Sequence, residues 1–172
     1  MHRRAFALAA AAALVLAACS SADDQTGSTA ERREIPFPYP FTTPTPPPDP
    51  TPIDGTYVRE VGPDLAGPAG KCVRCPPYRL ELGDTNTLSL EGGVYQVTHE
   101  MSEWESAGHF EVNGDRVVFF NDPNCPTERG GYRWQEGAAG LTLEVVEDDC
   151  AFGGLRARYL SATAWGEAGG DA

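Results

Sequence analysis

The sequence predicts an all-β protein, a small antiparallel up-and-down β-barrel of eight or nine strands that follows a disordered Pro-rich tether. The barrel is predicted because apolar and polar residues alternate over short stretches. This period of two is typical of strands with one buried face. Glycine-rich breaks separate these stretches, and no clear amphipathic helix pattern is present. The tether is predicted because residues 36–52 hold nine prolines in 17 positions.

The first 18 residues have the order of a secretory signal. Arg3 and Arg4 precede a 14-residue apolar run, residues 5–18. About 20 apolar residues are needed to span a bilayer as a helix, so this run is short for a membrane span. We therefore interpret residues 1–18 as a signal peptide that is removed.

The run ends in LAAC, residues 16–19. This tetrapeptide resembles the bacterial lipobox. The resemblance implies cleavage before Cys19, lipidation of its sulfur, and anchoring to a membrane on the extracytoplasmic side of the cell envelope. An ordinary cleaved signal followed by a chance cysteine is the alternative.

The charge balance excludes some partners. The chain from Cys19 onward carries all 25 acidic residues and 11 of the 13 basic ones, so its net charge is near −14. Such a chain is repelled by phosphate and by anionic headgroups, and Lys71 is its single lysine. We expect no nucleic-acid partner, and we expect membrane contact through the lipid anchor.

Residues 19–53 are predicted to be the lipidated cysteine and its linker. Residues 20–35 are polar and lack periodicity, so they should be disordered. Residues 36–52 should form a polyproline II spacer that reaches roughly 50 Å. We favour a stalk that holds the head off the membrane. A ligand for an aromatic groove and packing on the head are alternatives, because Phe37, Tyr39 and Phe41 alternate with prolines.

Residues 54–166 are predicted to be the barrel domain, and residues 167–172 a flexible tail. Strands joined by tight turns must be antiparallel, and closing the meander removes exposed strand edges. The clearest turn is Asn113-Gly114. The alternating apolar residues are Tyr78, Leu80 and Leu82; Leu88 and Leu90; Tyr95 and Val97; Phe110 and Val112; Tyr132 and Trp134; Leu141, Leu143 and Val145; and Leu155, Ala157 and Tyr159.

Five short motifs follow one another along this domain. They are DGTY (54–57), LEGGVYQV (90–97), GHFEVNGDRVVFF (108–120), GYRW (131–134) and LTLEVVEDDC (141–150), with Arg156 or Arg158 beyond. Their order resembles the small lipocalin-like β-barrel domains of bacterial lipoproteins, and the resemblance implies an up-and-down barrel. Tyr57 stands where lipocalins that carry ligands have the tryptophan of a GxW opening.

Four cysteines remain after Cys19, and in an oxidising compartment disulfides are their default. They are Cys72, Cys75, Cys125 and Cys150, and they allow three connectivities among which the sequence does not choose. We favour Cys125–Cys150, since each residue follows a predicted strand and the family resemblance points the same way. This bond would contribute about 3 kcal/mol, and Cys72–Cys75 would close a tight ring.

The CVRC stretch, residues 72–75, has a second interpretation as a thiol redox couple. Such sites lie at a helix N-terminus, where the helix dipole lowers the pKa of a thiol. Here glycine and proline precede the stretch, Pro76 and Pro77 follow it, and no helix is expected. Zinc is disfavoured because the other two cysteines are single and distant.

The remaining candidate chemistry is sparse. His99 shares the inward parity of Tyr95 and Val97, whereas His109 has outward parity, so the two rings should not converge on a metal. We expect His99 to be a barrel-mouth histidine with a hydrogen-bonded partner. The acidic run Glu147-Asp148-Asp149 is predicted to be a solvated turn that pairs with Arg156 or Arg158, rather than a calcium site. We therefore expect no enzyme activity, no metal and no cofactor.

The sequence thus predicts a membrane-anchored lipoprotein whose barrel is a non-catalytic binding module. The first function is binding of a small apolar or amphipathic ligand inside the barrel. The second is protein interaction or envelope structure with a filled barrel, and the third is thiol redox chemistry at Cys72 and Cys75. The expected ligand-binding residues are Tyr95, Val97, His99, Phe110, Trp134 and Tyr159.

Overall fold

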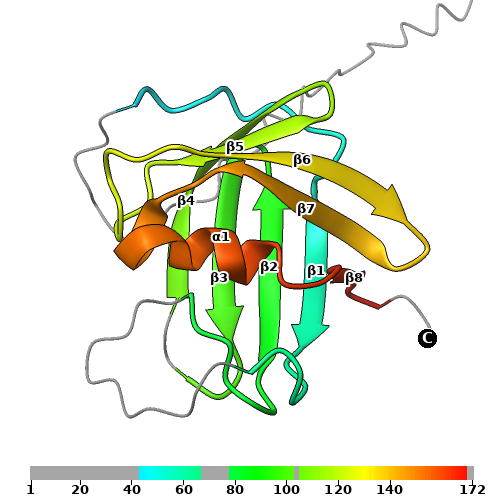
Figure 1. The fold of residues 1–172 in the computed structure, drawn as a ribbon. Helices are drawn as coiled ribbons and strands as arrows, with labels where there is room; N and C mark the ends of the chain where they lie inside the picture. Colours follow the sequence, from blue (N-terminus) through cyan, green and yellow to red (C-terminus); the bar gives the residue numbers. More distant parts are fainter. Residues whose placement is uncertain (1–42, 67–77, 103–104, 170–172) are drawn as a thin grey trace, which may run out of the picture.

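The computed structural model describes residues 43–66, 78–102 and 105–169. Within these residues it contains eight strands and one short α-helix, and it confirms the predicted antiparallel all-β barrel (Figure 1). The predicted signal peptide, Cys19, and the pair Cys72 and Cys75 lie outside the described residues, as do the three aromatic residues of the proline-rich stretch.

The strands follow one another in one antiparallel sheet, ordered β7-β6-β5-β4-β3-β2-β1-β8. Tight turns join the hairpins, and the Gly92-Gly93 turn has positive φ at both positions, as the predicted glycine break requires. The strands are β1 (Gly55–Glu60), β2 (Thr85–Glu91), β3 (Val94–His99), β4 (Glu105–Asn113), β5 (Arg116–Phe120), β6 (Gly130–Gly137), β7 (Gly140–Glu147) and β8 (Gly166–Glu167).

The barrel is closed by β8 and by one bridge from β7. Glu167 of β8 pairs with Tyr57 of β1. Leu141 of β7 exchanges both backbone hydrogen bonds with Trp165, at 2.9 and 2.8 Å. Since Glu167 belongs to β8, the barrel extends beyond the predicted boundary at residue 166. Past Leu141, β7 has no strand on this side among the described residues, so closure is partial.

The prediction of a strand from Leu155, Ala157 and Tyr159 is wrong. These residues lie in α1 (Leu155–Leu160), which follows a π-helical turn, Cys150–Gly154. The two glycines before the helix, Gly153 and Gly154, have φ of 75° and 87°, which a strand does not accommodate. Figure 1 shows α1 crossing in front of β2 and β3 on its way to β8.

The described part of the proline-rich segment, residues 43–52, contacts the barrel. The Thr43 N–H donates to Asn121 Oδ1 at 3.1 Å, and Asn121 Nδ2 donates to the Thr43 carbonyl at 2.8 Å. Ile53 is fully buried. The predicted domain start at residue 54 is therefore too late. Residues 43–52 are not a free stalk, since a proline-rich segment can still pack on a surface and accept hydrogen bonds through its carbonyl groups.

His109 is enclosed although it lies on the outer face of the barrel. His109 does have outward parity on β4, but its side chain is buried. Its ring stacks on Phe120 with centroids 6.0 Å apart, and its Nδ1 lies 3.2 Å from Asn121 Nδ2. Asn121 thus links His109 to Thr43, so this part of the outer face of the barrel is covered rather than wet.

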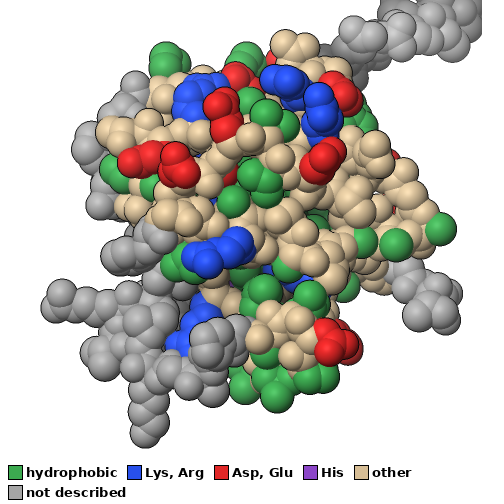
Figure 2. Space-filling model, in the orientation of Figure 1, with side chains coloured by type: hydrophobic (Ala, Val, Ile, Leu, Met, Phe, Trp, Pro, Cys, Tyr) green, Lys and Arg blue, Asp and Glu red, His purple; other side chains and the backbone are tan. Residues whose placement is uncertain are grey.

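The surface that carries α1, β6 and β7 has a mixed charge pattern. In Figure 2 acidic and basic side chains are interspersed over its upper part, and hydrophobic side chains lie between them. Among the described residues, no helix has the length and apolar character that a membrane crossing needs.

Candidate functional site

A buried ionic network occupies the interior where three chain segments meet. Asp122 follows β5, Asp148 follows β7, and Arg156 lies in α1. Arg156 Nε donates to Asp148 Oδ2 at 2.8 Å, and its Nη2 donates to Asp148 Oδ1 at 3.1 Å. Its Nη1 donates to Asp122 Oδ2 at 3.3 Å. This confirms the predicted pairing of an arginine with the acidic run, and it selects Arg156, since Arg158 is exposed. The expected solvated turn is wrong for Asp148, whose side chain is fully buried, whereas Glu147 and Asp149 are exposed.

Hydroxyl groups complete the coordination of Asp122. Tyr78 and Tyr95 both donate to its Oδ2, the latter at 2.7 Å. Ser106 Oγ and the Asn124 N–H donate to its Oδ1 at 3.1 and 2.8 Å. Because a buried carboxylate is costly unless its lone pairs are hydrogen-bonded, this shell makes the burial of Asp122 tolerable.

The network shifts the ionisation of its members. Burial and then the carboxylate of Asp122 raise the pKa of Tyr78 and of Tyr95. Burial and then Asp148, which accepts the Tyr132 hydroxyl hydrogen, raise the pKa of Tyr132. Burial opposes the charge of Arg156, but its interactions with Tyr95 and Asp148 outweigh burial, so its pKa is raised. The arginine is therefore a fixed cation, and these phenols stay protonated.

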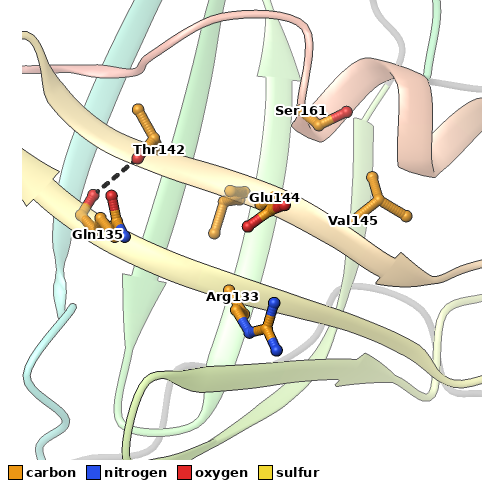
Figure 3. A pocket seen from close by; sticks show the side chains of 7 residues that line it. Arg133, Gln135, Thr142, Glu144, Val145 and Ser161 are labelled. Atoms are coloured by element: carbon orange, nitrogen blue, oxygen red, sulfur yellow. Dashed lines mark hydrogen bonds between the residues drawn. The ribbon is translucent and has the colours of Figure 1, made fainter.

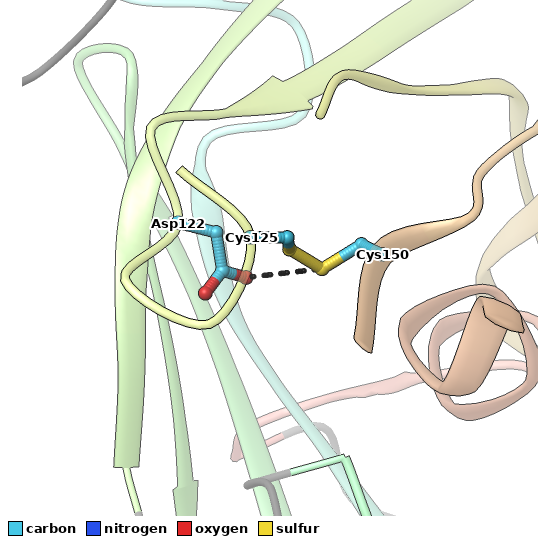
Figure 4. A group of neighbouring side chains, drawn as sticks. All are labelled: Asp122, Cys125 and Cys150. Carbon is cyan, nitrogen blue, oxygen red and sulfur yellow. Dashed lines mark hydrogen bonds between the residues drawn. A yellow bond between two sulfur atoms is a disulfide. The ribbon is translucent and has the colours of Figure 1, made fainter. Parts of the chain in front are cut away.

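The favoured disulfide Cys125–Cys150 is confirmed, with its Cα atoms 5.4 Å apart. Figure 4 shows it beside Asp122, whose Oδ2 lies 3.8 Å from the Cys150 sulfur. One carboxylate oxygen and the two sulfurs lie within 4.8 Å of one another, a spacing that would suit a metal. The two sulfurs are bonded to each other, however, so neither is a thiolate that could ligate one.

The residues expected to bind a ligand lie mostly in one packed core. Tyr95, Val97 and Phe110 are fully buried, and Tyr159 is nearly so. The ring of Phe119 packs against two of these residues: its centroid lies 5.0 Å from that of Tyr95 and 6.2 Å from that of Phe110. The barrel's own side chains thus occupy the space around these residues.

Two of the expected ligand-binding residues stand apart from this core. Trp134 is half-buried near the β4–β5 turn, where its Nε1 donates to the Gly114 carbonyl at 2.9 Å. His99 lies at the end of β3, with its Nδ1 2.6 Å from Asp84 Oδ2 and its ring centroid 5.7 Å from that of Tyr159. His99 therefore has the hydrogen-bonded partner expected of it.

A surface pocket of about 370 Å³ lies outside this core, beside β6 and β7 (Figure 3). None of the predicted ligand-binding residues lines it. The sequence could not reveal it, because Ser161 reaches the pocket only through the unpredicted helix. The pocket is lined by Arg133, Gln135, Thr142, Leu143, Glu144, Val145 and Ser161.

Sequence reasoning missed most members of the ionic network. Tyr78 and Tyr95 were recognised only as apolar positions of strands, and Ser106 carried no signal. The clearest available clue was Asp122, because it opens an Asp-Pro-Asn-Cys turn at the end of a strand. Comparison of the chain with protein-family models, curated proteins and solved structures finds no match.

Proposed function

We propose that this protein is a lipid-anchored extracytoplasmic lipoprotein whose barrel is a non-catalytic interaction module with a filled interior. The observation that carries the proposal is the network of Asp122, Asp148 and Arg156, which occupies the space that an internal ligand would need. The packed rings of Tyr95, Phe110 and Phe119 support the same reading. A filled barrel of this size offers its outer surface, rather than its interior, to a partner.

The free edge of β7 is the surface best suited to a protein partner. Beyond the Leu141–Trp165 bridge, residues 142–147 have no neighbouring strand on their outer side among the described residues. Val145 and Val146 are 38% and 44% exposed there, and the 370 Å³ pocket lies alongside. An unpaired strand edge can accept an extended segment of another protein through backbone hydrogen bonds.

Strand addition at β7 can be tested by site-specific cross-linking in the native host. A photo-reactive residue at Val146 should give a discrete adduct, whereas one at Arg116, exposed on β5, should not. The backbone N–H and C=O of Leu141 point away from β6, toward Trp165. Because this direction alternates along a strand, the N–H and C=O of Val145 also point away from β6. Val145→Pro removes that N–H and should abolish the adduct. Equal adducts at both positions would contradict the proposal.

The filled interior is tested by native mass spectrometry of the protein purified from its own host. We expect no co-purifying apolar molecule of lipid size. A stoichiometric lipid that is released only when the protein unfolds would favour the ligand-carrying alternative instead.

The lipid anchor is proposed from the LAAC motif at residues 16–19. Cys19→Ala should leave an unprocessed precursor without a diacylglyceryl group, because the sulfur that carries the lipid is gone. Mass analysis of the N-terminal peptide measures this, with the wild-type chain as control. An unmodified N-terminus beginning elsewhere in the wild-type protein would show an ordinary signal peptide.

A further inference from the structure

A second polar group lies at the end of the barrel where β1 and β3 finish, the lower end in Figure 1. Arg59, Asn86 and His99 are direct cross-strand partners on β1, β2 and β3. Tyr159 of α1 packs against this row, with its ring 4.8 Å from the Arg59 guanidinium carbon. The row therefore combines a cation, an amide and a phenol in one place.

Arg59 is held rigidly and is buried, with 5% of its surface exposed. Its guanidinium carbon lies 3.8 Å from the centre of the Trp165 ring, and its Nη1 donates to the Tyr159 carbonyl at 2.8 Å. Its Nε and Nη2 have no hydrogen-bond partner among the described residues. Arg156, the other buried arginine, has two carboxylate partners, so Arg59 is a buried cation that lacks its anion.

The unpaired atoms of the described interior are concentrated here. Four buried side-chain nitrogen or oxygen atoms lack a partner in the part of the chain that the structure describes, and they belong to Arg59 (Nε and Nη2), Asn86 (Oδ1) and Tyr159 (Oη). Leaving such an atom unpaired costs about 1–3 kcal/mol. Burial lowers the pKa of Arg59 and raises the pKa of Tyr159, and the interaction between these two side chains offsets only part of each shift.

Asp84 is a carboxylate that contacts this row, but its contacts are with residues other than Arg59. Its Oδ2 accepts from Asn86 Nδ2 at 2.8 Å and lies 2.6 Å from His99 Nδ1, and its Oδ1 accepts from the Met101 N–H at 2.9 Å. These contacts also fix the orientation of the Asn86 amide, with its oxygen left over. Among the described residues, no carboxylate is thus given a contact with the free side of the Arg59 guanidinium.

We propose that this row binds the carboxylate of a small organic acid. The Nε and Nη2 hydrogens of Arg59 form the side of the guanidinium fork that matches the two oxygens of a carboxylate. The Tyr159 hydroxyl supplies a third donor. Asn86 Oδ1 accepts a hydrogen from a hydroxyl or amide on the same ligand, so a hydroxy acid satisfies all four unpaired atoms. Stacking on Trp165 holds the fork in place before the ligand arrives.

The test is a titration of the purified protein with acetate and with glycolate, against chloride at constant ionic strength. NMR of the arginine Nε–H groups follows binding directly, and the Arg59 signal is assigned in the wild-type protein by through-bond correlation to the Arg59 backbone. We expect a saturable downfield shift of the Arg59 Nε–H with both acids, and tighter binding of glycolate. Chloride should not reproduce the shift.

Four variants sharpen the outcome. Arg59→Lys keeps the charge but loses the fork. The affinity for carboxylate, measured from the rise in melting temperature that the acid causes, should fall at least about tenfold. Tyr159→Phe should weaken binding to a smaller extent, and Arg116→Lys on the exposed face of β5 should bind like wild type. Val145→Pro at the β7 edge should also bind normally, which separates this site from the proposed partner surface.

Failure has a clear form. If the wild-type Arg59 signal does not shift with either acid, the four atoms hold ordered water only and the proposal is overturned. A stabilisation that survives in Arg59→Lys would overturn it as well. The wild-type NMR titration decides the matter even if a variant does not fold.

Discussion

Arg156 and Asp148 form a two-point ion pair in the interior of the barrel, with nitrogen–oxygen distances of 2.8 and 3.1 Å. Asp148 follows the end of β7 and Arg156 lies in the helix that comes next, so the pair turns the chain inward after the last long strand. The third nitrogen of the same guanidinium reaches Asp122 at 3.3 Å. The pair thereby joins the end of β7, the end of β5 and α1 in one contact.

Replacing Arg156 should destabilise the protein strongly. Arg156→Met keeps most of the side-chain volume but leaves two buried carboxylates without their cation, and breaking a buried pair in this way costs about 3–5 kcal/mol. Urea unfolding at neutral pH measures the loss. Arg158→Met, on the exposed face of the same helix, is the matched control and should change stability by less than about 0.5 kcal/mol. Equal effects of the two variants would show that the network is not what stabilises α1.

Removing the Cys125–Cys150 bond should cost about 3 kcal/mol, because it frees a long loop in the unfolded chain. The double variant C125A/C150A avoids a stray thiol, and the shift of its urea midpoint measures the cost. In the folded wild-type protein both sulfurs are buried, so a mild thiol should reduce this bond only after denaturant is added. Rapid reduction under native conditions would contradict the buried position of the bond.

Gly140 should be intolerant of any side chain. A Cβ there would lie 2.0 Å from the Trp165 carbonyl oxygen, and its φ of 97° disfavours other residues. Gly140→Ala should therefore break the Leu141–Trp165 bridge that closes the barrel, with a loss of about 1–3 kcal/mol or more. Gly137, its partner in the same hairpin, has open space around it, so Gly137→Ala should be nearly neutral. Faster hydrogen exchange at Trp165 in the first variant alone would report the open seam.

Stability should decline at alkaline pH. Burial, followed by Glu136, raises the pKa of Tyr57 to about 12 from 10.0. Burial also raises the pKa of Tyr78, Tyr95 and Tyr132. Between pH 10 and about 12 the folded state holds more protons on these tyrosines than the unfolded state does. The tyrosine contribution to the free energy of unfolding is therefore constant below pH 10 and falls as pH rises above 10. Each such tyrosine contributes a slope of about 1.4 kcal/mol per pH unit.

Urea unfolding from neutral pH to pH 11, with phenolate absorbance recorded in parallel, measures this decline. In a Tyr39→Phe background, which removes the tyrosine of the predicted linker, phenolate should appear together with unfolding rather than before it. Tyrosines that titrate near their ordinary pKa in the folded protein would contradict the burial of the network.

Most predicted strands were correct where one face is buried and the other is wet, but the alternating stretch Tyr78, Leu80 and Leu82 forms no strand, and Leu82 is 60% exposed. Tyr95 and Val97 on β3, and Leu141 and Leu143 on β7, alternate because the pleat sends successive side chains to opposite faces. The same rule gives the outward parity of His109 but not its burial, which accompanies its contacts with Phe120 and Asn121. It also misread Tyr159, since three apolar residues at period two can equally lie on a helix that is buried on most sides.

From the sequence alone came the antiparallel strands, the turns at glycine and the pairing of an arginine with the acidic run Glu147-Asp148-Asp149, because periodicity and local spacing encode them. The preference for Cys125–Cys150 also drew on the family resemblance. The tertiary structure decided the rest: the helix that replaces a strand, the enclosure of Asp122, the closure of Gly140 against Trp165, and the unpaired row at Arg59. These depend on which residues meet across the curved sheet, as Arg59 meets Tyr159 100 positions away. Such meetings arise from how the barrel curves and closes, which no local pattern records.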